Sequence, residues 1–261
     1  MPDAPTPNKA LGQHWLHDEA CLAAMCDAVS VTADDTVLEI GPGLGTLTKL
    51  LVEQAHQVLA VEFDEALACD LPGRIPASNL SVVRSDILRF DLTTLPAEYK
   101  VVANIPYYLT SNLIRVLSES SNPPSAVALL VQKEVAERVA AKPGDMSVLS
   151  VTAQLYWEVS LGRIVKAELF TPPPKVDSQI LILHRRTQPL FPEVDTKAYF
   201  RVVKAGFAQR RKTLLNSLSS GLHLSRAEAE ALLYKASIPP NGRAQTLTLE
   251  QWNELQKYLT C

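Results

Sequence analysis

Apolar positions in the first two-thirds of the chain alternate between two spacings. Short runs rich in β-branched residues predict strands, and stretches with apolar residues three and four positions apart predict amphipathic helices between them. The predicted strands are 36–40, 57–62, 80–84, 100–104 and 126–131, and the predicted helices are 18–29, 46–55, 64–71, 110–119 and 133–141. Because strands and helices alternate, we expect an α/β fold built on a parallel, doubly wound sheet with right-handed crossovers.

The pattern changes in the last third of the chain. Residues 158–165 and 178–186 predict two strands on either side of the proline-rich segment FTPPPK, so the sheet should close with an antiparallel hairpin. Further on, the predicted helices are 195–209, 211–220, 225–236 and 247–259. We therefore expect a disordered tail over 1–10, a catalytic α/β domain over 11–188 and a small all-α domain over 189–261.

Charge is distributed unevenly along the chain. Residues 1–184 hold 13 Lys and Arg against 22 Asp and Glu, whereas residues 185–261 hold 12 against 6. This excess favours a polyanion bound mainly by the helical part, although solvated Lys and Arg on ordinary helices give the same count.

The N-terminus has no secretory pattern, no apolar run approaches the ~18 residues of a membrane span, and the four cysteines show no disulfide-like spacing. We expect a cytoplasmic protein that does not act at a membrane.

A glycine-rich turn, Gly41-Pro42-Gly43-Leu44-Gly45, follows the first predicted strand. Glycines let the chain turn sharply and let a ligand lie against the backbone without meeting a Cβ atom. The G-x-G-x-x-G spacing of dinucleotide enzymes requires glycine at position 46, where this chain has Thr46. The observed G-x-G-x-G spacing is usual for nucleoside cofactors that carry a sulfonium.

Two carboxylates stand at the ends of the next two predicted strands. Glu62 can accept hydrogen bonds from both hydroxyls of a ribose, and Asp86 can accept one from an adenine amino group. Both could instead cap helices. Because the turn, Glu62 and Asp86 are in register along a Rossmann-like sheet, we favour a cofactor site at its carboxyl edge.

The segment ANIPYYLTS ends the fourth predicted strand. The Asn104 side-chain oxygen and the Ile105 carbonyl can accept both hydrogens of an adenine amine, whose lone pair is otherwise delocalised into the ring. Pro106 adds no competing N–H, and Tyr107 offers a face for base stacking, worth ~1–3 kcal/mol. Catalysis would then depend on positioning and preorganised acceptors, with in-line attack on a methyl sulfonium and no strong general base. A strand that ends in a proline turn with core aromatics is the alternative.

With these residues assembled, the chain resembles the KsgA-type ribosomal RNA adenine dimethyltransferases from residue 8 to its end. The resemblance includes the following segments: LGQHWLHD, EIGPGLGTLT, VEFD, SDIL, NIPYYLTS, LVQKEVAERV, LSVTAQ, FTPPPKVDS, FAQRRKTLLNSL and GRAQTLTLEQW. Single motifs are shared with other methyltransferases, but this ordered set is specific. It implies a Rossmann-like class I methyltransferase sheet with a helical C-terminal domain.

The resemblance also implies a reaction. S-adenosylmethionine would be the cofactor and S-adenosylhomocysteine the product of four methyl transfers to two adjacent adenines, in a hairpin loop near the 3′ end of small-subunit rRNA. A loop adenine is already largely unpaired, so turning it into a pocket costs little. The implied role is in small-subunit biogenesis. The substrate would be the rRNA or a pre-30S-type particle, and the enzyme would be a monomer.

The family's site residues fall on matching positions of this chain. The cofactor contacts are His14, Leu16, Gly41, Glu62, Asp86 and Asn104, to which we add Gly43 of the glycine turn. The target base would contact Asn104, Tyr107 and Phe170, with Phe170 stacking from the opposite side.

Two segments depart from the family pattern. Gly12-Gln13-His14-Trp15-Leu16 stands where members usually read G-Q-N-F-L, so His14 replaces an asparagine, and Met146-Ser147 replaces a Tyr-Gly pair. His14 and His17 have no third ligand in sequence, so we expect no metal site.

The basic segment Arg210-Arg211-Lys212 predicts contacts with rRNA phosphates, as does Lys175 in the proline-rich loop. A salt-bridge cluster that holds the two domains together is the alternative for the Arg-rich segment. Two other functions stay open: an Erm-type methyltransferase of a 23S rRNA adenine, and a non-catalytic nucleic-acid-binding relative. The QRRKT segment and the GRAQTLTLEQW ending favour the small-subunit enzyme over the first, and the complete set of pocket residues disfavours the second.

Overall fold

The computed structural model describes residue 7 and residues 11–209 and 211–259. The chain divides into two compact units, one made of residues up to Ala136 with Trp157–Arg185, the other of Glu137–Tyr156 with Arg186 onward. Apart from Pro7, the predicted tail over 1–10 lies outside the described residues. The boundary drawn at 188 from the sequence did not anticipate that residues 137–156 group with the helical part.

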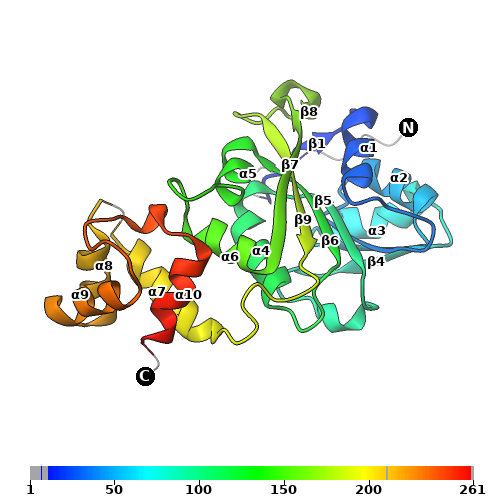
Figure 1. Ribbon diagram of the computed structural model, residues 1–261. Helices are drawn as coiled ribbons and strands as arrows, with labels where there is room; N and C mark the ends of the chain where they lie inside the picture. Colours follow the sequence, from blue (N-terminus) through cyan, green and yellow to red (C-terminus); the bar gives the residue numbers. More distant parts are fainter. Residues whose placement is uncertain (1–6, 8–10, 210, 260–261) are drawn as a thin grey trace. The chain divides into compact units, whose positions relative to one another are not determined.

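A seven-stranded sheet forms the centre of the first unit (Figure 1), in the order β4-β3-β2-β5-β6-β9-β7. Its strands are β2 (Thr36–Ile40), β3 (Gln57–Glu62), β4 (Leu80–Arg84), β5 (Lys100–Asn104), β6 (Ala126–Gln132), β7 (Trp157–Val165) and β9 (Ser178–Arg185). The pairs from β4 to β6 are parallel, whereas β9 lies antiparallel between β6 and β7. The predicted fold class, a parallel sheet closed by an antiparallel hairpin, is confirmed.

Helices cover both faces of this sheet. They are α1 (Glu19–Ala28), α2 (Thr46–Gln54), α3 (Glu65–Arg74), α4 (Thr110–Glu119) and the start of α5 (Lys133–Val139). Asp18 caps α1 and Asp64 caps α3 through side-chain oxygens that accept backbone N–H bonds. One face packs α1 and α2 against alternate strand residues such as Val37 and Val102, and the intervening residues, such as Leu38, are buried as well. Burial on both faces explains why these strands are mostly apolar.

A second, two-stranded sheet joins distant parts of the chain. Strand β1 (Trp15–Leu16) pairs antiparallel with β8 (Phe170–Thr171), and Figure 1 shows the two strands side by side. The Thr46 hydroxyl at the start of α2 donates a 2.9 Å hydrogen bond to the Leu16 carbonyl. The N-terminal segment is therefore fixed beside both the glycine turn and the proline-rich loop.

The second unit is helical and has a hydrophobic core of its own around Trp252 and Tyr199. Its helices are α6 (Val148–Tyr156), α7 (Thr196–Phe207), α8 (Leu214–Leu222), α9 (Arg226–Lys235) and α10 (Leu249–Lys257). Helix α6 was not predicted, and it buries Val151 and Leu155 in this core.

The loop before α6 contains the Met146-Ser147 departure. The Met146 side chain is buried in the core of the second unit, and its N–H donates to the carbonyl of Gln245. The Gln245 side-chain amide in turn donates a 2.7 Å hydrogen bond to the Gly144 carbonyl. At this position the departure is accommodated by packing, and Gln245 of the GRAQTLTLEQW segment holds the loop in place.

Across the described ranges, no helix is long and apolar enough to cross a membrane. The same part of the chain holds no cluster of three or more His, Cys, Asp or Glu side chains suited to a metal ion.

Candidate active site

A cavity of about 250 Å³ opens at the carboxyl edge of strands β2 to β5. Open α/β sheets bind ligands at this edge because the loops that follow the strands diverge there. The lining residues come mainly from the N-terminal segment and from the loops that follow β2, β3, β4 and β5. They include eight of the residues that the sequence singles out: His14, Leu16, Gly41, Gly43, Glu62, Asp86, Asn104 and Tyr107.

The glycine turn forms the floor of the cavity between β2 and α2. Gly41 has φ +66°, and a Cβ atom there would meet no atom of the described residues within 4 Å, so the turn leaves room for a ligand against the backbone. Gly45 has φ +84° at the N-cap of α2, where a Cβ atom would lie 2.8 Å from Leu71 Cδ1. The positive φ and the close contact with Leu71 both favour glycine at position 45.

Glu62 ends β3 and is only 5% exposed. Its Oε2 accepts a 3.1 Å hydrogen bond from the Gly43 N–H, and its Oε1 accepts a 2.9 Å bond from the Asp64 N–H. Burial raises the pKa of this carboxyl, while the backbone donors act in the opposite direction. Asp64, not Glu62, is the N-cap of α3. Glu62 is thus held across the glycine turn, with lone pairs left to accept from ligand hydroxyls.

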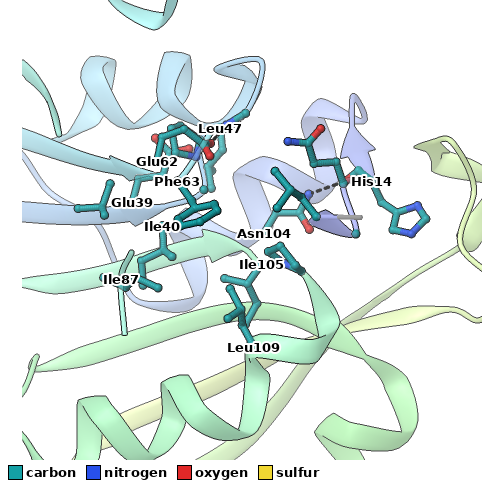
Figure 2. A pocket seen from close by; sticks show the side chains of 18 of the residues that line it. His14, Glu39, Ile40, Leu47, Glu62, Phe63, Ile87, Asn104, Ile105 and Leu109 are labelled. Atoms are coloured by element: carbon teal, nitrogen blue, oxygen red, sulfur yellow. Dashed lines mark hydrogen bonds between the residues drawn. The ribbon is translucent and has the colours of Figure 1, made fainter. Parts of the chain in front are cut away.

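Asp86 lies on the next loop, after β4. Its Oδ1 accepts a 3.0 Å hydrogen bond from the Leu88 N–H, so it caps a turn as well as lining the cavity. Phe63 also lines the cavity, and its ring is 60% exposed. Figure 2 shows Phe63 on the same side of the pocket as Ile87. An exposed aromatic ring beside a carboxylate suits a nucleobase, and the sequence analysis missed Phe63 because nothing before folding marks it as exposed.

Glu39 is a second residue that the sequence analysis missed. It lies on the central strand β2, is 1% exposed, and lines the cavity with an Oε2 atom that has no hydrogen-bond partner among the described residues. Burial raises the pKa of its carboxyl to about 8, and the nearby charge of Glu62 adds to this effect. Glu39 could have been identified from the sequence, because it is the single acid in the otherwise apolar strand segment TVLEI. At neutral pH this carboxyl keeps its proton, and its unpartnered oxygen can accept a hydrogen bond from a ligand donor.

Asn104 is oriented by the N-terminal segment. Its Nδ2 donates a 3.1 Å hydrogen bond to the His14 carbonyl, drawn as a dashed line in Figure 2. Because the amide nitrogen is engaged there, the side-chain oxygen Oδ1 remains as the acceptor. The His14 ring points away from Glu62 in Figure 2, and its Nδ1 lies 2.7 Å from the Pro172 carbonyl. The side chain that replaces the family's asparagine is therefore bonded to the proline-rich loop.

The two aromatic residues predicted to hold a base behave differently. Tyr107 lines the cavity, lies 5.9 Å from the His14 ring with planes 20° apart, and is hydrogen bonded through its hydroxyl to Ser178 Oγ. Burial raises the pKa of this hydroxyl. Phe170 does not line the cavity and is only 3% exposed, because pairing of β8 with β1 draws it into the core. This structure does not support base stacking by Phe170, whereas Tyr108, 62% exposed on the cavity rim, is open to a base.

The predicted RNA contacts are exposed where they are described. Lys175 is exposed in the loop that His14 contacts through Pro172. Arg211 and Lys212 are exposed in the second unit, and neither forms an ion pair with another described residue of that unit. Arg210 lies outside the described residues.

Two solved structures similar to this chain over nearly its whole length are methyltransferases. A dimethyladenosine transferase from Plasmodium falciparum superimposes with a TM-score of 0.80 at 25% identity, covering 95% of this chain and 98% of the other. The 23S rRNA methyltransferase ErmE does so with a TM-score of 0.74 at 29% identity, covering 95% and 100%. The sheet order and a nucleoside-sized cavity above the glycine turn place the protein among the class I S-adenosylmethionine-dependent methyltransferases.

Sequence comparison defines the family within this class. The ribosomal RNA adenine dimethylase model matches residues 5–260, and the chain belongs to that family. The ribosomal RNA small subunit methyltransferase A of Dehalococcoides mccartyi strain 195 is 41% identical over 95% of this chain and 86% of its own length. The protein of the same description from Shouchella clausii is 39% identical over 97% and 90%. The predicted family, enzyme class and cofactor are confirmed: the chain is an rRNA adenine dimethyltransferase that uses S-adenosylmethionine.

The cavity suits this cofactor. S-adenosylmethionine presents ribose hydroxyls, an adenine, a sulfonium and an ammonium group, and the cavity offers carboxylates and exposed aromatic surface but no Lys or Arg among its lining residues. The unpartnered Oε2 of Glu39 is a buried acceptor that a donor group of the ligand can satisfy.

Proposed function

We propose that this enzyme dimethylates the exocyclic amines of two adjacent adenines in the 3′-terminal hairpin loop of small-subunit rRNA, as a step in small-subunit biogenesis. The curated relatives at about 40% identity over nearly the whole chain are described as small-subunit methyltransferases, which supports this substrate. The observation that carries the chemistry is the orientation of Asn104, whose Nδ2 is engaged by the His14 carbonyl so that Oδ1 is available as an acceptor at the cavity.

The predicted cofactor residues divide by chemistry. Glu62 accepts from the ribose hydroxyls, Asp86 accepts from the adenine amine, and Phe63 contributes its exposed ring. His14 and Leu16 serve through backbone at the edge of β1, and Gly41 and Gly43 let the ligand approach the turn. When bound, S-adenosylmethionine would supply an activated methyl group for transfer to the adenine nitrogen.

On the substrate side, two acceptors act on the adenine amine. Asn104 Oδ1 and the Ile105 carbonyl each accept a hydrogen bond from the amine. These bonds draw the nitrogen toward a pyramidal state, in which its lone pair is no longer delocalised into the ring. Tyr107 supports the base through its ring, which Ser178 and His14 hold in place. Catalysis is then mainly positioning in a preorganised polar site.

Binding of the RNA depends on its phosphates. The proposed contacts with these phosphates are Lys175, Arg210, Arg211 and Lys212. The proposed substrate is a pre-30S-type particle. The enzyme would bind it as a monomer in the cytoplasm. Phosphate contacts of this kind weaken as salt concentration rises.

The structural similarity to ErmE supports a second candidate function, which is methylation of a large-subunit rRNA adenine. Incubation of purified protein and labelled S-adenosylmethionine with small and large ribosomal subunits from a strain that lacks these modifications separates the two. After digestion of the rRNA, mass analysis should find dimethyladenosine at two adjacent positions of the 3′-terminal hairpin. Label confined to large-subunit RNA would move the protein to the Erm type. Cofactor binding with no label in either RNA would favour a non-catalytic role.

A further inference from the structure

Trp15 carries a hydrogen-bond donor without an acceptor. Its indole Nε1 is buried and has no partner among the described residues, and the residue lines the cavity. The ring lies against the glycine turn, since a Cβ atom on Gly43 would stand 3.2 Å from Nε1. A buried N–H that stays unpaired destabilises a fold, and a ligand in the cavity that supplies an acceptor would remove this cost.

Other side-chain donors of the cavity are already engaged within the protein. The Thr46 hydroxyl donates to the Leu16 carbonyl, and Asn104 Nδ2 donates to the His14 carbonyl. The Tyr107 hydroxyl is bonded to Ser178 Oγ, and His14 Nδ1 lies at hydrogen-bond distance from the Pro172 carbonyl. Trp15 differs from these four lining residues in having a buried donor with no protein acceptor.

The charges of the cavity indicate which ligand group this donor meets. Glu39 and Glu62 provide acceptors for donor groups of the cofactor, but no Lys or Arg lines the cavity to balance a carboxylate. An anion in such a cavity must be bound by neutral N–H groups, and N–H bonds to a charged acceptor are roughly twice as strong as those to a neutral one. Ribose hydroxyls, by contrast, are donors to Glu62.

We propose that the indole N–H of Trp15 donates a hydrogen bond to the methionine carboxylate of S-adenosylmethionine and so selects for the intact amino-acid end of the cofactor. This inference rests on the cofactor site proposed above. The Trp15 donor would act together with the backbone N–H groups at the start of α2, which also favour an anion. Trp15 stands where family members usually have phenylalanine, so this donor is a property of the present chain.

The test is a binding comparison of two proteins and two ligands by titration calorimetry. Trp15→Phe removes the N–H and keeps an aromatic ring, and decarboxylated S-adenosylmethionine removes the acceptor and keeps the rest of the ligand. We expect Trp15→Phe to weaken binding of S-adenosylmethionine about tenfold and to change binding of the decarboxylated ligand less than about twofold. Unchanged affinity for S-adenosylmethionine, or an equal loss for both ligands, would overturn the proposal.

Two controls separate this role from other causes. Trp252→Phe removes another buried, unpartnered indole N–H, in the core of the second unit, and should leave both affinities unchanged. Retained affinity of Trp15→Phe for the decarboxylated ligand shows that the variant is folded. Wild-type protein that binds neither ligand would overturn the cofactor site itself, whereas equal binding of S-adenosylmethionine by wild type and Trp15→Phe overturns only the role of Trp15.

Discussion

The Asn104 side chain and the His14 backbone, 90 residues apart in sequence, are joined by a 3.1 Å hydrogen bond. The His14 ring extends this link to the Pro172 carbonyl at 2.7 Å. The end of β5, the N-terminal segment and the proline-rich loop are thus joined around one carboxamide. Its orientation, on which the proposed chemistry depends, is set by residues that do no chemistry themselves.

Replacement of Asn104 should separate catalysis from cofactor binding. In Asn104→Ala the acceptor for the adenine amine is lost, so we expect methyl transfer to be abolished. Cofactor affinity should stay within about tenfold, or about 1.4 kcal/mol, because Glu62 and Asp86 remain. Single-turnover methylation and calorimetric titration measure the two effects, and a parallel loss in both would contradict the assignment.

Replacement of Glu62 should have the opposite pattern. Glu62→Ala removes a carboxylate that binds ribose hydroxyls and leaves the Gly43 N–H without its partner. Loss of charge-assisted hydrogen bonds of about 1.5–3 kcal/mol predicts at least a tenfold weaker affinity for S-adenosylmethionine. Glu65→Ala is a matched control, since that carboxylate is exposed on α3 and pairs with Arg84. Unchanged affinity in Glu62→Ala would refute the ribose role.

Glu39 should make stability depend on pH. Its carboxyl has a pKa raised from 4.5 to about 8 in the folded protein, so it holds a proton that the unfolded chain releases. This contribution to the free energy of unfolding is fully present below pH 4.5 and is lost as pH rises toward 8, by up to about 1.4 kcal/mol per pH unit. Urea unfolding at several pH values should show wild type losing stability relative to Glu39→Gln. Parallel pH curves for the two proteins would contradict the prediction.

Phe170 should act through packing. Because its ring is buried in the core beside Leu16, Phe170→Ala should destabilise the protein by about 3–5 kcal/mol. Phe170→Leu keeps most of the apolar volume and should retain most of the stability and the methylation rate. Thermal unfolding and rate measurements on both variants decide the matter. A stable Phe170→Leu protein that has lost activity would restore the stacking role expected from the resemblance.

The basic segment of the second unit should contact phosphates. Arg211→Gln and Lys212→Gln remove exposed charges, so each should weaken RNA binding and lower the slope of log affinity against log salt by up to about 1. Filter binding of the 3′-terminal rRNA hairpin across a salt series measures the slope. If these residues instead form a salt-bridge cluster, the variants will unfold at lower temperature with an unchanged salt slope.

Regular elements could be predicted because their patterns are local. The runs 36–40 and 100–104 alternate with amphipathic segments, and the structure has strands over the same residues. Strands β1 and β8 could not be predicted in this way, because two residues have no periodicity and each strand exists only through the other. Helix α6 was not predicted because Val148, Val151 and Thr152 are β-branched residues, which lower helix propensity. Its helical state depends on burial in the core of the second unit.

The site was predicted in part for a similar reason. A glycine turn after a strand and an acid at a strand end can be recognised from residue type and spacing alone, so Gly41 and Glu62 were identified. Which atoms are buried without a partner is a property of the folded chain alone, and Glu39 and Trp15 emerged only there. Phe170 shows the converse, since a residue in a polar, proline-rich loop was drawn into the core by its pairing with Leu16.

Pairing of Trp15 with Thr171 also has a consequence for the order of synthesis. Chains emerge from the ribosome N-terminus first, and domains fold as their residues become available. The glycine turn and Glu62 are made early, but the N-terminal wall of the cavity cannot be fixed until β8 has left the exit tunnel. A nascent chain of this enzyme is therefore unable to hold its methyl donor fully while it is still being made. An enzyme that modifies ribosomes becomes competent only after its own proline-rich loop has been made.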